Sequence, residues 1–366
     1  MKIGYVLHPY EESHASGMGY SMLELCKQLV TRWGDENEIV VYTTKRVSPE
    51  ILPGAYTNVL IPSGLVRQLL YFLFVKRVDT LFFTAPLLPL IPFSSIKSAM
   101  LCKELGSQKM PVRGKEAIFA YFRDRLLMTA SLKRANMVFV SSQATKDDLL
   151  KFYKTPQEKI FVTYEGFQDL TKIPQKDYQD NVAVDMRPYF FFTGKLKYRK
   201  NVHGIVSAFI AFKKRNSSKC KLIIGGSAEG SYYEKIKREI DSVGFTDDVY
   251  FAGYVSPEDL YQFYKNAVAT VFPSFNEGFG MPILESMNIG TPVITSNISS
   301  MREIAKDAAV LVDPYSVEEI SQAMERLYSK EEERKKYIEK GHIIAQKFSW
   351  PKVADSIMAV IQNSVQ

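Results

Sequence analysis

The chain has 366 residues, of which 46% are hydrophobic and 24% are charged. This length suits two domains, and the balance is typical of a soluble globular enzyme and excludes a disordered or fibrous chain. The formal net charge of +7 is compatible with nucleotide phosphates, an acidic membrane surface or nucleic acid, and does not choose among them.

The first half of the chain alternates short apolar runs with amphipathic helical stretches. Strands rich in Val, Ile and Phe that lack strict alternation suit a parallel sheet covered on both faces. Strands are expected at 2–7, 38–44, 78–84, 98–103, 137–142 and 159–164, and helices at 22–33 and 116–135. No signal peptide is expected, because no basic region with a small-residue cleavage site follows Met1.

Two apolar segments bear on membrane association. Segment 81–93 is too short to span a bilayer and contains Pro86, Pro89 and Pro92. Segment 64–77 is apolar and basic, and it is either an ordinary core helix or a stretch that rests on a membrane.

The chain has 3 cysteines, Cys26, Cys102 and Cys220, which are far apart and form no C-x-x-C pair. They are expected to be reduced, buried thiols, which favours a cytoplasmic protein. A place at the inner face of the membrane is the alternative that segment 64–77 leaves open.

The second half repeats the alternation after a polar, proline-bounded stretch. Strands are expected at 189–194, 221–226, 248–255, 268–274, 292–297 and 309–314. The expected organisation is an N-terminal domain at 1–170, a linker at 171–188, a C-terminal domain at 189–345 and a helix at 346–366 that packs back on the first domain. Two doubly wound parallel-sheet domains of this kind would face each other across a ligand-binding cleft.

The segment 272–297 is the most informative. A buried strand leads into a loop with Gly278 and Gly280, and a short helix is predicted from Pro282 to Ile289, with Glu285 in its first turn. Glycines let backbone N–H groups approach a ligand, and a helix N-terminus attracts oxygen-rich groups. Glu277 and Glu285 would then face one site as acceptors for sugar hydroxyls. The structural alternative is that one complements the helix dipole and the other caps the loop.

A basic loop follows the strand that opens the second half. Four cationic residues gather there: Lys195, Lys197, Arg199 and Lys200. Asn201 is expected to cap the following helix, so charge and free N–H groups converge as they would around a diphosphate. A solvated charged loop is the other interpretation.

Gly17 and Gly19 lie between the first strand and the first helix. A lone G-x-G is weak evidence for a ligand loop. A dinucleotide site is disfavoured, because Met22 stands where a third glycine would be expected and no acidic residue closes the second strand.

Taken together, these segments resemble the large group 1 family of retaining glycosyltransferases, which have the GT-B fold. Glu277 and Glu285 occupy the two acidic positions of its E-x(seven)-E signature, and the full motif E-G-F-G-x-P-x-L-E is present. The resemblance covers nearly the whole chain, densely in the second half and loosely in the first. Among the family, the chain looks most similar to bacterial mannosyltransferases.

The resemblance implies that 1–170 is the acceptor-side domain and 189–345 the nucleotide-sugar-binding domain, and it implies roles for single residues. Glu277 would hold the donor sugar, Glu285 the ribose, and Arg199 with Lys200 would stabilise the departing diphosphate. Donor contacts are also implied for Gly278, Phe279, Gly280, Gly17, Gly19, Lys195 and Lys103. Lys195 stands where many members have an arginine, and Lys103 stands where relatives often have a sugar-contacting histidine.

The expected function is transfer of a hexose, mannose first, from a nucleotide sugar to a growing cell-surface or lipid-linked glycan, with retention of configuration. GDP-mannose is the first donor and UDP-sugars stay open. No metal cofactor is expected, because the chain has no D-x-D and only 4 widely spaced histidines, and no nucleic-acid partner is expected. A nucleotide-sugar epimerase of the same fold and a donor-binding, non-catalytic partner subunit are the alternatives.

Overall fold

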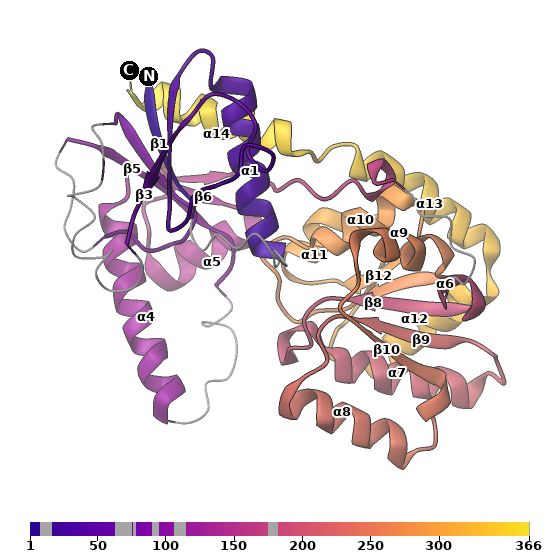
Figure 1. Ribbon diagram of the computed structural model, residues 1–366. Helices are drawn as coiled ribbons and strands as arrows, with labels where there is room; N and C mark the ends of the chain where they lie inside the picture. Colours follow the sequence, from indigo (N-terminus) through magenta and orange to yellow (C-terminus); the bar gives the residue numbers. More distant parts are fainter. Residues whose placement is uncertain are drawn as a thin grey trace. The chain divides into compact units, whose positions relative to one another are not determined.

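The computed structural model describes residues 1–7, 17–62, 75, 78–89, 95–105, 115–174 and 182–365. The chain divides into two compact units (Figure 1). Unit 1 comprises Met1–Gly166 and Phe348–Gln366, and unit 2 comprises Phe167–Lys347. The chain therefore enters unit 2 slightly before the boundary that the sequence suggests, and returns to unit 1 at its end.

Unit 1 is built on a 7-stranded sheet with the order β3-β2-β1-β4-β5-β6-β7, and its neighbouring strands are parallel. The strands are β1 (Lys2–Val6), β2 (Glu38–Thr43), β3 (Thr57–Leu60), β4 (Thr80–Phe83), β5 (Lys97–Cys102), β6 (Met137–Val140) and β7 (Ile160–Val162). All except β3 confirm predicted strands. β3 escaped prediction because it is a short edge strand with no buried residue, so its sequence carries no buried apolar run.

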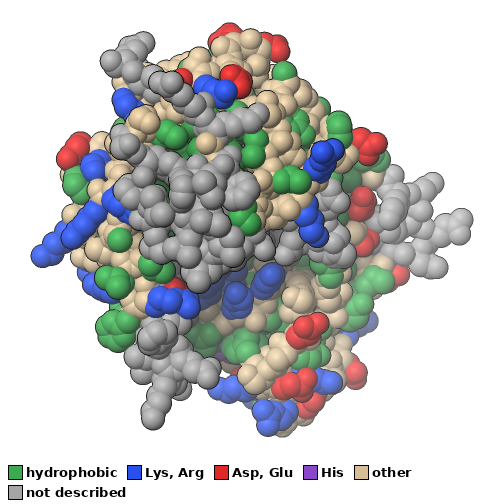
Figure 2. All heavy atoms as spheres, turned by 60° about the vertical axis from the view of Figure 1, so that its left-hand side comes forward, with side chains coloured by type: hydrophobic (Ala, Val, Ile, Leu, Met, Phe, Trp, Pro, Cys, Tyr) green, Lys and Arg blue, Asp and Glu red, His purple; other side chains and the backbone are tan. Residues whose placement is uncertain are grey.

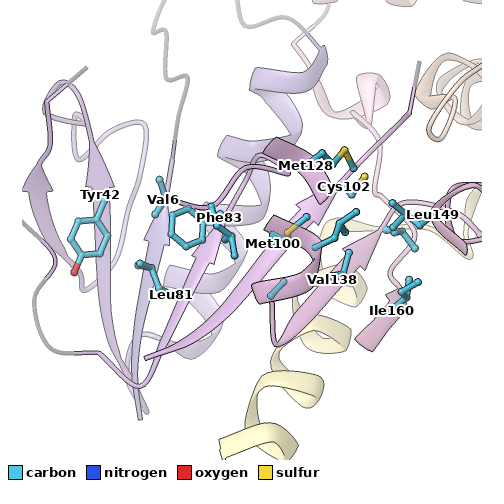
Figure 3. Packing of buried hydrophobic residues seen from close by; sticks show 14 of the residues in the cluster. Val6, Tyr42, Leu81, Phe83, Met100, Cys102, Met128, Val138, Leu149 and Ile160 are labelled. Carbon is cyan, nitrogen blue, oxygen red and sulfur yellow. The ribbon is translucent and has the colours of Figure 1, made fainter. Parts of the chain in front are cut away.

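The helices among the described residues of unit 1 are α1 (Gly17–Trp33), α4 (Lys115–Arg134), α5 (Gln143–Tyr153) and α14 (Trp350–Val365). One core cluster takes side chains from strands β1, β2, β4, β5, β6 and β7 and from helices α4 and α5 (Figure 3). The last helix, α14, lies beside α1, where the Arg32 guanidinium donates to both carboxylate oxygens of Asp355 at 3.0 and 2.7 Å. This bidentate pair is one contact between the two helices.

Unit 2 contains a 6-stranded sheet with the order β10-β9-β8-β11-β12-β13, again parallel. The strands are β8 (Tyr189–Thr193), β9 (Lys221–Gly225), β10 (Val249–Gly253), β11 (Ala269–Phe272), β12 (Val293–Ser296) and β13 (Val310–Val312). Each confirms a predicted strand. The order places β8 and β11 side by side, so the loops that leave their carboxyl ends meet at one edge of the sheet.

The helices of unit 2 are α6 (Val182–Asp185), α7 (Val202–Arg215), α8 (Gly230–Ser242), α9 (Pro257–Asn266), α10 (Met281–Ile289), α11 (Ser299–Ala305), α12 (Val317–Ser329) and α13 (Glu331–Ala345). The prediction of a linker at 171–188 is wrong for the residues described there. Ala183 of α6 is buried in a cluster with Leu170, Tyr189 and Tyr264. This apolar contact makes the stretch part of unit 2.

The three cysteines are free and buried, which confirms the expectation of reduced thiols. Burial raises the pKa of the Cys102 thiol to about 12, so it stays protonated at neutral pH. Across the described residues, no helix has the combination of length and apolar character that crossing a bilayer requires. Segment 64–77 lies outside the described residues apart from Val75.

Lysine and arginine side chains form several separate groups on the face drawn in Figure 2, and acidic side chains lie among them. Among the described residues drawn there, the positive charge is thus not gathered into one block. Net charge alone does not locate a binding site on this face, so a site has to be located from the chemistry of individual side chains.

Candidate active site

The signature segment of unit 2 folds as strand, loop and helix, as predicted. Strand β11 ends at Phe272, a buried loop follows, and α10 begins at Met281 with Pro282 in its first turn. Gly280 precedes the helix with a φ of 113°, a left-handed conformation that favours glycine. A left-handed Gly290 ends the helix. Phe279, between the two loop glycines, is only 4% exposed.

The Glu277 carboxylate lies between two cations. Its Oε1 is 2.6 Å from Lys200 Nζ, and its Oε2 accepts a hydrogen bond of 2.9 Å from Arg199 Nη1. The Glu277 side chain is 7% exposed, that of Lys200 13% and that of Arg199 22%. The three predicted catalytic residues are therefore brought together in one largely buried cluster, called here the cation–carboxylate cluster.

The cation–carboxylate cluster contains more positive than negative charge. Burial raises the pKa of Glu277, but Lys200 and Arg199 outweigh it and hold that pKa below its usual value. The carboxylate is thus ionised at neutral pH, and the three groups together carry one net positive charge. A partly desolvated cation of this kind attracts a phosphate strongly.

Hydrogen bonds to backbone carbonyls connect the two loops that carry the cluster and join one of them to α11. The Phe275 N–H donates to the Arg199 carbonyl at 2.8 Å, and Arg199 Nη1 donates to the Asn276 carbonyl at 3.1 Å. The Ser300 hydroxyl at the start of α11 donates to the Glu277 carbonyl at 2.9 Å. The position of each charged group is therefore set by packing between loops at the carboxyl edge of the sheet.

Asn201 does not play the predicted role. It precedes α7 but has a left-handed backbone, and its side chain makes no capping hydrogen bond. Its Nδ2 instead donates to the carbonyls of Pro273 at 3.1 Å and Pro314 at 2.7 Å. Asn201 thus ties the loop after β11 to the loop after β13, a role that only the tertiary fold creates.

Glu285 is also placed differently from the prediction. It lies in the second turn of α10, since the first turn holds no acidic residue, and it is 9% exposed. The Tyr264 hydroxyl on α9 donates to Glu285 Oε2 at 3.0 Å. Burial raises the pKa of Glu285 to about 7, and the hydrogen bond from Tyr264 opposes that rise. The two signature acids therefore differ sharply in environment.

The remaining predicted residues are divided between the units. Lys195, in unit 2, is exposed to solvent. In unit 1, Gly17 and Gly19 stand in the first turn of α1 rather than in a loop before it. Lys103, just after β5, lies 3.1 Å from the Glu165 carboxylate and contacts the Ser21 hydroxyl of α1. Lys103 and Glu165 are 12% and 9% exposed, so they form a buried ion pair.

Tyr264 is the residue at this site that the sequence did not single out. Its signal was present, because a tyrosine on the apolar face of a helix needs a hydrogen-bond partner once buried. The identity of that partner, 21 positions away, could not be read from local periodicity.

The fold is GT-B, and the cation–carboxylate cluster lies at the carboxyl edge of the sheet of unit 2. The structure of HepE from Anabaena, solved with UDP and glucose, has 15% identity and a TM-score of 0.75, covering 99% of this chain and 100% of that one. At this identity the likeness shows the fold, GT-B, and no more.

Residues 175–343 match the family described as glycosyl transferases group 1. The chain is similar to O-antigen chain mannosyltransferase B of Escherichia coli, with 27% identity over 60% of this chain and 58% of that protein. It is also similar to O-antigen chain mannosyltransferase RfbU of Salmonella typhimurium, with 33% identity over 53% of this chain and 51% of that protein. The chain thus spans little more than half the length of these curated relatives.

The raised pKa of Glu285 predicts how stability depends on pH. The pKa of this carboxyl is about 7 in the folded state and 4.5 ordinarily. Between these two pH values the folded state therefore binds more protons than the unfolded state. Stability is expected to fall as the pH rises through this window, by about 3 kcal/mol in total from this group. Urea unfolding between pH 5 and pH 8.5 should show that Glu285→Gln lacks this part of the decline. Identical pH slopes in both proteins would contradict it.

Proposed function

We propose that the protein is a metal-independent, retaining glycosyltransferase that moves a hexose, mannose first, from a nucleoside diphosphate sugar to a growing glycan. The observation that carries this proposal is the cation–carboxylate cluster of Arg199, Lys200 and Glu277, which lies beside the signature helix of a group 1 glycosyl transferase region. Lys195 of the basic loop is exposed to solvent, and it would supply the phosphate contact that an arginine makes in many relatives.

The chemistry follows from the charges. Transfer breaks the bond between the anomeric carbon and the diphosphate oxygen and forms a bond to an acceptor hydroxyl. Negative charge builds on the departing diphosphate, where Arg199 and Lys200 can stabilise it without a metal. The proton of the acceptor hydroxyl passes to the departing phosphate. Glu277 holds the sugar, Gly278, Phe279 and Gly280 line the donor, and Glu285 binds the ribose hydroxyls.

The unit 1 residues enter the proposal as further donor contacts. Gly17 and Gly19 leave the start of α1 open to close approach, since glycine has no side chain. Lys103 enters together with Glu165, because the two form an ion pair. The pair would offer hydrogen bonds to a sugar hydroxyl rather than a net positive charge.

The choice of donor and acceptor rests on the relatives. Two proteins similar to this chain bear the name O-antigen chain mannosyltransferase, which supports transfer of mannose to an O-antigen chain. GDP-mannose is the first donor that we propose, and a lipopolysaccharide glycan is the proposed acceptor. UDP-sugars are the second candidates, because the structurally similar HepE was solved with UDP and glucose. A lipid-linked acceptor would place the protein in the cytoplasm at the inner face of the membrane.

The test is a transfer assay with GDP-mannose and UDP-glucose, with lipid-linked glycan acceptors and with or without EDTA. Wild type should release nucleoside diphosphate and form a product with the donor's anomeric configuration, unaffected by EDTA. Glu285→Ala and Lys200→Ala should both lose turnover. Formation of an isomerised nucleotide sugar would indicate an epimerase instead, and binding without turnover on any acceptor would indicate a partner subunit.

A further inference from the structure

Glu285 and Tyr264 form a buried pair between α9 and α10. Tyr264 is 0% exposed and Glu285 9%, and the tyrosine hydroxyl donates to Glu285 Oε2 at 3.0 Å. A carboxyl at this depth has lost most of its hydration, so a hydrogen bond to it weighs far more than at the surface.

The hydroxyl of Tyr264 is held in place independently of Glu285. The Thr291 hydroxyl donates to the Tyr264 carbonyl at 2.7 Å, and the ring packs edge-on against Phe191 of β8, with centroids 5.3 Å apart. Helix α9 itself is fixed at its start by Ser256, whose side chain accepts from the Asp259 N–H. Contacts with Thr291, with β8 and at the capped start of α9 therefore fix the place from which the Tyr264 hydroxyl donates to Glu285.

Among the described residues, few other polar groups compete for this carboxyl. Burial and the Tyr264 hydroxyl are the causes of its altered pKa. Of the elements packed against α10, the end of α13 brings His342 toward Gly290, and Asp169 accepts a hydrogen bond from Asn288 at 2.8 Å. Both lie toward the carboxyl end of α10, beyond Glu285 in the sequence.

We propose that Tyr264 is a positioning residue that orients the Glu285 carboxylate for contact with the donor. This inference rests on the proposed function, in which Glu285 binds the ribose. A hydrogen bond from Tyr264 occupies one oxygen of Glu285 and leaves the other to accept from the ligand. Because the bond favours the charged carboxylate, it also extends donor binding toward lower pH.

The test compares Tyr264→Phe with a matched control, Tyr189→Phe. Tyr189 belongs to the same buried cluster, but its hydroxyl donates to the Phe263 carbonyl at 2.9 Å. The titration of Glu285 is followed by carboxyl-carbon NMR, with Glu285→Gln to assign the signal. Tyr264→Phe should move the midpoint upward by about one pH unit, the size of one hydrogen bond to a charged group. Tyr189→Phe should leave it in place.

Binding of GDP and UDP between pH 6 and pH 9 supplies the second readout. Tyr264→Phe should weaken binding about tenfold near pH 6.5 and less at pH 8.5, and it should have no further effect in a Glu285→Gln background. An unmoved NMR midpoint, or an equal loss of affinity with and without Glu285, would overturn the role of Tyr264. If wild type bound neither nucleotide while the NMR midpoint still moved, the proposed function would fail and the positioning of Glu285 would stand.

Discussion

Replacing Lys200 by methionine is expected to lower kcat/KM for the nucleotide-sugar donor by about 10²- to 10³-fold, the loss typical of removing one preorganised group that stabilises developing charge. In the wild-type protein the Lys200 ammonium lies 4.7 Å from the centroid of the Phe272 ring. Methionine has an apolar side chain of similar length, so the change removes the ammonium and keeps most of the packing. The effect should fall mainly on kcat, because negative charge on the diphosphate grows toward the transition state. Steady-state kinetics with a saturating acceptor measure it.

Lys213→Met is the matched control for this change. Lys213 is also a buried lysine of unit 2, 10% exposed, and it pairs with Asp248 at 2.9 Å, but it lies at the far end of α7 from the cluster. Both variants break a buried ion pair and should lose stability for that reason. Only Lys200→Met should lose turnover. Similar kinetic losses in both variants would mean that instability, rather than a missing cation, explains the result.

Glu277→Gln is expected to have an effect of similar size, and it separates two roles. The change removes the carboxylate that Lys200 and Arg199 share, at 2.6 and 2.9 Å, and breaking a buried pair of this kind costs about 3–5 kcal/mol of stability. Turnover should fall at least about 10²-fold, because the sugar loses a charged hydrogen-bond acceptor and keeps only a neutral amide oxygen. Affinity for GDP or UDP should stay within a few-fold or rise, since an anion that competes with the diphosphate for the two cations is removed.

Parallel loss of nucleoside diphosphate affinity and turnover would show instead that Glu277 mainly positions the cations. The pH dependence offers an independent check on the pairing. The pKa of Glu277 is held below its usual value of 4.5 by Lys200 and Arg199, so its contribution to stability is complete above that value and is lost as the pH falls through the folded-state pKa. Acid unfolding of Glu277→Gln should lack this part of the loss.

Much of the fold could be predicted because its signals are local. Buried parallel strands need apolar residues on both faces, so β8 and β11 can be recognised in the sequence as continuous apolar runs. The helix α10 has a proline at its start and a glycine at its end. The edge strand β3 lacks both kinds of signal, and it was missed for that reason.

The candidate site was predicted in its residues more than in its arrangement. The spacing of Glu277 and Glu285 predicted that both acids face one site. In the structure Glu277 pairs with two cations, whereas Glu285 accepts a hydrogen bond from a tyrosine. Asn201 was expected to cap its own helix and instead bridges two loops. In each case the partner lies far along the chain, where hydrophobic periodicity carries no information.

The sequence by itself determined that two parallel α/β units follow one another and that acids, glycines and cations stand at the carboxyl edge of the second. Those features depend on residue type and on spacing over a few positions. Only the tertiary structure decided which charges meet, how deeply each is buried and therefore how each ionises. The reason is physical: the pKa of a carboxyl depends on its hydration and on the groups within a few ångströms, and both are set by packing between distant segments.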